Sequence, residues 1–154
     1  MAARVGKLLV THNMMLVTAE SCTGGGLSQA ITSIPGSSEW FERGYVTYSN
    51  EAKQELSDVG AETLERYGAV SEEVVSEMAE GALRHSRAHI SVAVTGIAGP
   101  EGGVPDKPVG TVWLAWAVHD GQTRAARLQF SGDRGAIRRQ AVMAALQGLS
   151  DMLE

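Results

Sequence analysis

Cysteine is almost absent from this 154-residue chain, in which Cys22 is the only one. A single thiol excludes an internal disulfide framework and a metal site built from several thiolates. The four histidines form neither an HExxH motif nor a comparable spacing. His85 and His89 lie four apart, but we expect a helix to end near Ala88, between them. The sequence therefore predicts no metal and no cofactor.

Long hydrophobic runs are also missing, and none approaches the ~20 residues that a helix needs to cross a bilayer. The apolar part of residues 1–10 is too short and too interrupted for a signal peptide. Hydrophobic residues make up 44% of the chain, which suits a folded domain of ordinary size. We therefore expect one domain over residues 1–154, located in the cytoplasm and without contact to a membrane.

Basic residues are not in excess, because 13 Lys and Arg stand against 18 Asp and Glu, a net charge of −5. A domain that holds nucleic acid along its backbone usually presents a basic face. The acidic excess lies in residues 1–100, with 7 basic and 12 acidic side chains, whereas residues 101–154 hold 6 of each. We expect no extended nucleic-acid binding, but the arginines grouped near the C-terminus leave room for one small anionic ligand.

Segments with strand-like composition alternate with segments of helical spacing, and no internal repeat or linker interrupts them. The last two expected strands are joined by Asp120-Gly121-Gln122, which indicates an antiparallel hairpin. The pattern is typical of an α/β fold, a single three-layer domain with a mixed β-sheet flanked by helices. Loops at the strand ends commonly hold the ligand in such folds. Helices are expected over 5–13, 23–33, 50–56, 61–66, 71–88 and 133–153, and strands over 14–19, 41–49, 90–94, 109–118 and 123–130.

The stretch from Val17 to Gly26, V-T-A-E-S-C-T-G-G-G, joins an expected strand to an expected helix. The first N–H groups of a helix lack acceptors and carry the positive end of its dipole, and glycines let a ligand approach the backbone. Ser21 could attack a carbonyl carbon while nearby amides hold the oxyanion. Equally, the segment could be a capped helix start with glycines for tight packing. It matches neither a GxSxG, a Walker A nor a GxGxxG motif.

Cys22 is the alternative nucleophile in this stretch, because a helix start lowers the pKa of a thiol. The commoner role for such a residue is a small buried apolar side chain.

A second polar cluster surrounds Asn50, the expected N-cap of a helix that places Lys53 in its first turn. There the positive end of the dipole favours the neutral amine. A neutral lysine can act as general base toward a serine, and the hydroxyl of Tyr48 can relay or orient the proton. The alternative is a solvated lysine beside a tyrosine at the end of a strand.

Two further segments could hold a phosphate or a sugar. The glycine-rich stretch T-G-I-A-G-P-E-G-G, from Thr95 to Gly103, follows an expected buried strand and could wrap an anion with backbone amides. Near the last helix, Asp133 is the expected cap, and Arg134 and Arg138 lie four apart on one face, where they could clamp a phosphate. The alternative is an exposed basic helix start paired with Asp133.

Several separated segments together resemble one known family. They include T-A-E-S-C-T-G-G at 18–25, G-Y-V-T-Y-S-N-E-A-K at 44–53, T-G-I-A-G-P-E-G-G at 95–103 and F-S-G-D-R at 130–134. In this order they resemble the C-terminal domain of the competence/damage-inducible CinA family, over about residues 10–150. The resemblance implies metal-independent hydrolysis of the carboxamide of nicotinamide mononucleotide. The products would be nicotinate mononucleotide and ammonia, in pyridine-nucleotide salvage.

The resemblance also implies roles for individual residues. It implies Ser21 as nucleophile with Tyr48 and Lys53 in support, a nucleotide as small-molecule substrate, and a homo-oligomer with a dimer favoured. Many family members carry a further N-terminal domain that resembles molybdopterin-binding proteins. This sequence shows no such domain, so we expect the stand-alone form. The alternative function is a non-catalytic nucleotide-binding or regulatory module linked to competence or DNA damage. We expect the substrate to contact Glu20, Thr23, Gly24, Gly25, Thr95, Gly96, Gly99, Arg134 and Arg138.

Overall fold

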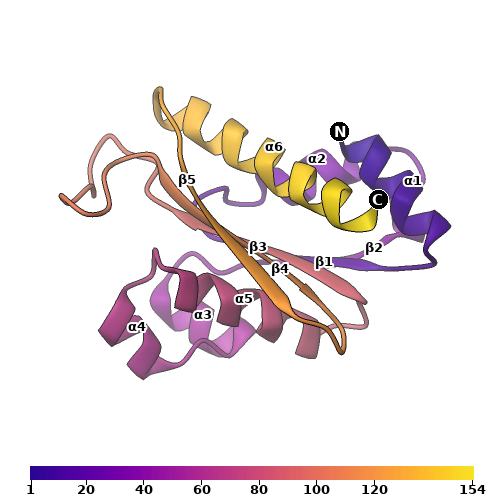
Figure 1. The fold of residues 1–154 in the computed structure, drawn as a ribbon, viewed down its shortest axis with the longest axis horizontal. Coiled ribbons are helices and arrows are strands. Elements are labelled where there is room, and N and C mark those ends of the chain that lie inside the picture. The colour runs from indigo at the N-terminus through magenta and orange to yellow at the C-terminus, as the bar shows by residue number, and fades with distance from the viewer.

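One mixed sheet of five strands, in the order β2-β1-β3-β4-β5, runs through the middle of the computed structural model, which describes residues 1–154 (Figure 1). β1 is parallel to its neighbours β2 and β3, whereas β4 is antiparallel to β3 and β5. The predicted mixed sheet and terminal hairpin are therefore confirmed. The strands are β1 (Leu16–Glu20), β2 (Phe41–Val46), β3 (Ile90–Gly96), β4 (Thr111–Val118) and β5 (Thr123–Gln129).

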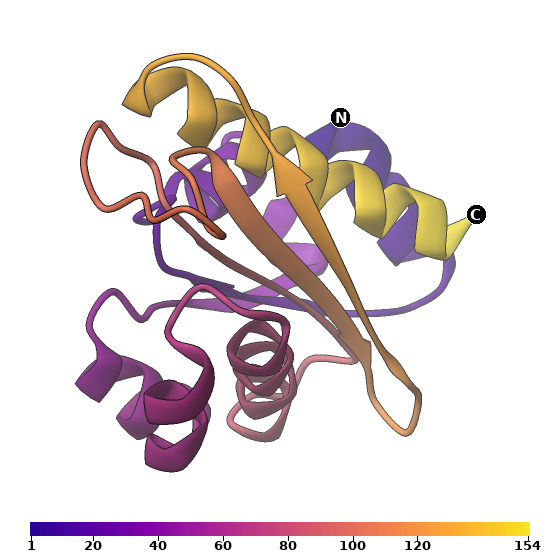
Figure 2. The same ribbon diagram turned by 60° about the vertical axis from the view of Figure 1, so that its left-hand side comes forward.

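Helices cover both faces of this sheet and complete the predicted three layers (Figures 1 and 2). One face carries α1 (Ala2–Thr11), α2 (Gly26–Thr32) and α6 (Arg134–Leu153). The other carries α3 (Asn50–Ser57), α4 (Ala61–Tyr67) and α5 (Glu72–Arg84). β1 is fully buried and β3 nearly so, because inner parallel strands are covered on both sides. A short 3-10 turn spans Ser37–Glu39. None of the helices has the length and apolarity required to span a bilayer.

The register places the carboxyl ends of β1, β2 and β3 side by side. Glu20 at the end of β1 pairs with Val46 of β2 and Val94 of β3. Two further backbone bonds extend this pairing, from Ser21 N–H to Val94 O at 3.0 Å and from Thr47 N–H to Glu20 O at 2.8 Å. The loops that leave these three strands therefore meet at one edge of the sheet, the usual place for a ligand in such folds.

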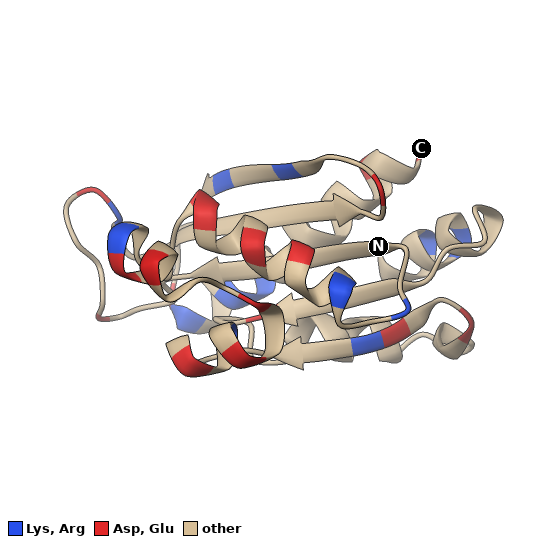
Figure 3. Cartoon of the chain, turned by 90° about the horizontal axis from the view of Figure 1, so that it is seen from below, with Lys and Arg blue, Asp and Glu red and all other residues tan.

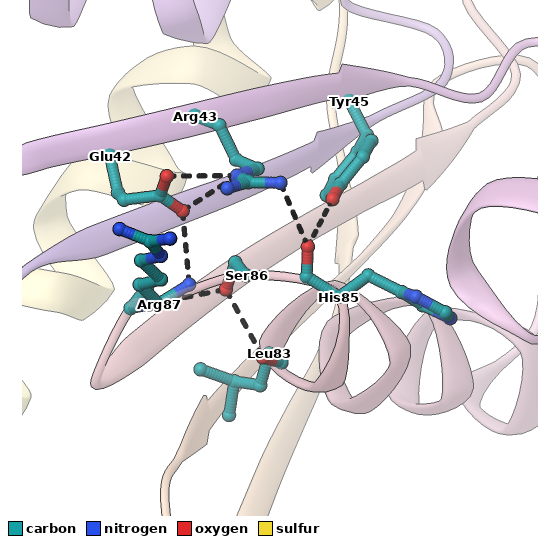
Figure 4. Close-up of polar contacts among 8 residues, drawn as sticks. Glu42, Arg43, Tyr45, Leu83, His85, Ser86 and Arg87 are labelled. Atoms are coloured by element: carbon teal, nitrogen blue, oxygen red, sulfur yellow. Dashed lines mark hydrogen bonds and ion pairs between the residues drawn. The ribbon is translucent and has the colours of Figure 1, made fainter.

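Side chains of β2 fasten the C-terminal end of α5 (Figure 4). Arg43 and the hydroxyl of Tyr45 both donate to the carbonyl of His85, the residue that ends α5. The carboxylate of Glu42 accepts from the backbone N–H of Arg87 at 3.1 Å. These bonds satisfy groups at a helix end that would otherwise lack partners, and they fix α5 against the sheet.

Acidic residues recur along the helices α3, α4 and α5 (Figure 3). These helices carry the acidic excess expected of the first hundred residues. Their charge is opposite to that of the surface with which proteins follow a nucleic-acid backbone. The acidic residues of these helices are Glu51, Glu55, Glu62, Glu65, Glu72, Glu73, Glu77 and Glu80.

Three helix starts differ from the sequence prediction, and the first of them is that of α1, which begins at Ala2 rather than at residue 5. α2 begins at Gly26 rather than at residue 23, because Gly24 and Gly25 have φ angles of 57° and 101° that a right-handed helix does not allow. α3 is capped by Ser49, whose side chain accepts from the N–H of Ala52, so Asn50 is its first helical residue.

The cap predicted at Asp133 is confirmed, and Ser71, the first residue of the predicted helix 71–88, caps α5 in the same way. Their side chains accept from backbone N–H groups at 2.8 Å and 3.2 Å, respectively, at the starts of α6 and α5.

Candidate active site

Ser21 and Lys53 meet at the carboxyl edge of the sheet. Ser21 follows β1, and Lys53 reaches it from α3, on the opposite face of the sheet from α2. The Lys53 Nζ and Ser21 Oγ atoms lie 3.0 Å apart, and the two residues are only 1% and 7% exposed. Residues 32 positions apart in sequence thus form one buried hydroxyl–amine pair.

The surroundings of Lys53 determine how this pair can share protons. Besides Ser21, Nζ contacts the backbone oxygens of Thr47 at 2.8 Å and Tyr48 at 3.0 Å. Carbonyl oxygens only accept hydrogen bonds, so these two take two N–H groups of the amine. In the neutral amine, the remaining position is a lone pair directed at the Ser21 hydroxyl. The geometry suits an amine that accepts the serine proton.

Burial lowers the pKa of Lys53 below its usual value of 10.5, because the charged form loses its hydration. No carboxylate lies within hydrogen-bond distance of Nζ to oppose this. From the sequence, the helix dipole was expected to favour the neutral amine, whereas the structure shows burial as the main cause. Desolvation is the dominant effect.

Tyr48 lies at the mouth of the site rather than between Ser21 and Lys53. It is 62% exposed, and its hydroxyl contacts Arg134 Nη2 at 3.3 Å. Arg134 also donates to the carbonyl of Gly99 at 2.8 Å. The phenol therefore has a contact with the arginine and none with the buried pair, so a direct transfer from serine to lysine fits the geometry better than a relay.

A cavity of about 290 Å³ opens over the pair. Two of its wall residues, Ala69 and Val70, come from the loop between α4 and α5 and were not expected at the site. The signal for them was the segment G-A-V-S-E at 68–72, which begins with Gly68, the glycine that ends α4. The walls are Ser21, Cys22, Tyr48, Lys53, Ala69, Val70, Thr95, Gly96, Ile97, Ala98, Gly99, Glu101, Gly102 and Arg134.

Of the expected substrate contacts, Thr95, Gly96, Gly99 and Arg134 line this cavity. The hydroxyl of Thr95 donates to the carbonyl of Ala69 at 2.8 Å, so it also ties two walls together. Thr23, Gly24 and Gly25 lie in the turn behind Ser21 and do not line it.

A larger hollow, of about 750 Å³, lies at the other edge of the sheet around His89 and His119. Both histidines are exposed, and the serine there, Ser86, donates to the carbonyl of Leu83 (Figure 4). This larger hollow contains no buried pair of nucleophile and base. The chemistry therefore places the candidate active site in the smaller cavity.

Cys22 lines the cavity next to Ser21, but burial raises the pKa of its thiol to about 11. A thiol of this pKa is almost entirely protonated near neutral pH and is a poor nucleophile. The structure therefore favours Ser21 over Cys22 as nucleophile. A helix start was expected to lower the pKa of the thiol, but burial raises it by more.

Replacing Cys22 with alanine is expected to leave catalysis at this site close to that of the unchanged protein. In the native protein, iodoacetamide should alkylate Cys22 much more slowly than in urea, because burial disfavours the thiolate. An activity assay measures the first effect and mass spectrometry the second. A loss of activity as severe as that of a nucleophile mutant would assign the attack to the thiol instead.

Glu20 does not contact the cavity, contrary to the expectation from sequence. It is completely buried, and Oε1 accepts from the Thr23 hydroxyl at 2.6 Å and from Leu27 N–H at 2.8 Å. Oε2 accepts from the N–H and the hydroxyl of Ser28 at 3.0 Å and 2.7 Å. The carboxylate closes the N-terminus of α2, where the helix dipole favours a negative charge.

Glu20→Gln is expected to destabilise the protein by about 1–3 kcal/mol, because the new amide group turns a donor toward the N–H and O–H groups at the start of α2. Urea unfolding measures this change. Ser33, whose hydroxyl donates to Gln29 O on the exposed side of the same helix, provides the control. Ser33→Ala should have little effect, and equal losses for both variants would contradict a special role for Glu20.

Arg138 also departs from its expected role. Its guanidinium donates to the carbonyl oxygens of Cys22 at 3.1 Å and Thr23 at 3.2 Å, and it does not line the cavity. Only Arg134 of the expected arginine clamp faces the site, because the turn behind Ser21 occupies the other guanidinium.

Comparisons with known proteins agree over nearly the whole chain. The family model described as CinA C-terminal domain matches residues 1–153. The nicotinamide-nucleotide amidohydrolase PncC of Escherichia coli (strain K12) is 55% identical over 149 residues, covering 97% of this chain and 90% of that protein. The protein of the same name from Pseudomonas putida is 55% identical over 150 residues, covering 97% and 92%. The crystal structure of the competence/damage inducible protein CihA from Agrobacterium tumefaciens has a TM-score of 0.97 at 44% identity, covering 99% of this chain and 93% of that one.

Proposed function

The chain belongs to the CinA C-terminal domain family, and from that premise we propose that it hydrolyses the carboxamide of nicotinamide mononucleotide without a metal. The products are nicotinate mononucleotide and ammonia. Relatives named for this activity are 55% identical over nearly the whole chain. The observation that carries the proposal is the 3.0 Å contact between Ser21 Oγ and Lys53 Nζ at the wall of a cavity.

In the first half of the reaction, Lys53 Nζ accepts the Ser21 proton while Oγ attacks the carboxamide carbon. The carbon–oxygen bond forms as the carbonyl π electrons move to the oxygen. The lysine ammonium then passes its proton to the amide nitrogen, the carbon–nitrogen bond breaks, and ammonia leaves. The carbonyls of Thr47 and Tyr48 keep Nζ beside Oγ throughout, because they hold its other two hydrogens.

In the second half, a water molecule attacks the acyl-serine ester. Neutral Lys53 accepts the proton of the water, and the tetrahedral intermediate collapses with transfer of that proton to Ser21 Oγ. Nicotinate mononucleotide is released, and the hydroxyl–amine pair is restored. One buried amine thus serves as base and acid in turn, with no metal needed to activate the water.

The oxyanion of both tetrahedral intermediates needs donors close to Ser21. The backbone N–H of Thr23 donates to no acceptor within the protein, so it remains available. One such preorganised donor contributes roughly 3 kcal/mol to transition-state stabilisation.

The glycine-rich loop and Arg134 are the proposed binding elements for ribose and phosphate. Arg134 is held at the rim by Gly99 O and the Tyr48 hydroxyl, which leaves donors of its guanidinium for a phosphate. Glu101 lines the cavity and offers the negative charge that a pyridinium ring requires. Glu20, which was expected to contact the substrate, is fully buried and cannot offer this charge.

The proposal extends to the organisation of the protein. We propose that residues 1–154 act as one domain, because the two clusters of buried hydrophobic residues pack on opposite faces of the same sheet. A homodimer, which the family resemblance alone implies, and a location in the cytoplasm complete the proposal.

Ammonia release from nicotinamide mononucleotide tests the proposal directly, with the purified protein and with a sample treated with a chelator. Equal release in both samples is the expected result. Binding of the nucleotide without any ammonia would instead indicate the alternative, a non-catalytic nucleotide-binding or regulatory module. Release that the chelator abolishes would contradict the metal-independent mechanism.

A further inference from the structure

Arg138 holds the turn that carries Ser21, although it lies on α6 and more than a hundred residues away in sequence. Its Nε donates to Cys22 O at 3.1 Å and its Nη2 to Thr23 O at 3.2 Å. A Cβ atom built on Gly24 would lie 3.4 Å from Nη2, so the guanidinium packs directly on the turn. One planar group thus donates to two successive carbonyls through two of its nitrogens, in the fixed geometry of a guanidinium.

The hydrogen bond that closes this turn leaves the orientation of one of its peptides unrestrained. Gly24 N–H donates to Ser21 O at 3.0 Å and closes a four-residue turn. The central peptide of such a turn, here Cys22–Thr23, takes no part in that bond, and turn types differ mainly in its orientation. Arg138 supplies the missing restraint, because it holds the oxygen of this peptide.

The orientation of the carbonyl fixes that of the amide. A trans peptide is planar, so the Thr23 N–H points opposite to the Cys22 carbonyl. That carbonyl faces α6, which lies on the same side of the sheet as α1 and α2 (Figures 1 and 2). The Thr23 N–H therefore points away from the guanidinium of Arg138.

We propose that Arg138 is a positioning residue, which orients the Cys22–Thr23 peptide so that the Thr23 N–H faces the oxyanion of the reaction. The inference deepens the proposed function and rests on it. A guanidinium bound to the carbonyl also polarises the peptide, and hydrogen bonds in a chain strengthen one another. Arg138 thus acts on the transition state through the backbone, without contact to the substrate.

Three variants test the proposal: Arg138→Met, Arg138→Lys and, as control, Arg139→Met. Arg139 is the exposed neighbour on α6, and it makes no hydrogen bond or ion pair. Steady-state kinetics with nicotinamide mononucleotide give kcat and KM, and calorimetry gives the affinity for nicotinate mononucleotide. Thermal unfolding shows whether each variant is folded.

Arg138→Met is expected to lower kcat by about 10- to 100-fold, since one oxyanion donor is worth roughly 10²–10³ and the peptide keeps part of its orientation. KM and the affinity for the product should stay within about twofold, because the ligand is not touched. Arg138→Lys should fall between Arg138→Met and the unchanged protein, because an ammonium keeps the charge and the donors but lacks the planar, fixed geometry of the guanidinium. Arg139→Met should behave like the unchanged protein.

A different division of the effect between kcat and KM overturns the proposal. An increase of KM and a loss of product affinity at constant kcat would make Arg138 a phosphate ligand, and an unchanged kcat would leave it no role in the reaction. If Arg138→Met does not fold, Arg138→Lys gives the same comparison.

If the unchanged protein releases no ammonia, the proposed function fails. The crystal structure of Arg138→Met then still tests the orienting role by itself. A rotated Cys22–Thr23 peptide supports it, and an unmoved one refutes it.

Discussion

Ser21→Ala is expected to abolish ammonia release from nicotinamide mononucleotide, with a loss in kcat of roughly a thousandfold or more, as for other nucleophile mutants. The methyl group cannot form the acyl ester, and no second nucleophile is available, because the Cys22 thiol has a pKa of about 11. Binding of the nucleotide should persist, since Ser21 Oγ is committed to Lys53 and the rest of the cavity wall is unchanged. Kinetics and calorimetry separate the two effects.

Cys22→Ala is the matched control for this loss, because it removes a side chain of similar size from the adjacent position in the same wall. It should keep its activity. Rapid acid quenching of the unchanged protein, followed by peptide mass analysis, should place an acyl group on the peptide that contains Ser21. Turnover in Ser21→Ala at the rate of the unchanged protein would refute the nucleophile assignment.

The fold was largely predictable because its signals are local. Ser71 and Asp133 cap helices through bonds to residues three positions on, and the apolar run of β3 needs burial on both faces. The errors have local causes as well. Ser49 and Asn50 are both good caps, and only the backbone conformation decides between them. The turn before α2 has helix-like sequence after it, but Gly24 and Gly25 adopt left-handed conformations.

The candidate site was predictable only in part. Polar residues at the ends of neighbouring strands had to meet, which brings Ser21, Thr95 and the residues after β2 together. A charge beside a glycine turn, however, looks the same in sequence whether it faces a ligand or the main chain. Glu20 and Arg138 were therefore expected at the substrate, although they hold α2 and the turn behind Ser21.

Lys53→Met is expected to lower kcat by about 10³-fold or more, an effect comparable with the loss of other triad-like bases. Methionine matches the length of the buried chain but cannot accept the serine proton, so Oγ remains a neutral hydroxyl. Lys53→Arg should be equally inactive, because a guanidinium stays protonated. Lys7 on α1 is exposed and provides the control, and Lys7→Met should retain activity. Activity of Lys53→Met at the level of Lys7→Met would eliminate the lysine as base.

The pH dependence gives an independent measure of the same amine. Because burial lowers the pKa of Lys53 below 10.5, the rate should rise with pH through that lowered pKa and then level off. Between the lowered pKa and 10.5, the unfolded chain binds more protons at this residue than the folded one, so the free energy of unfolding rises with pH. Lys53→Met should lose this rise, whereas Lys7→Met should keep it. A rate that falls as pH increases through this range would mean that the charged lysine is the active form, and Ser21 would then need another base.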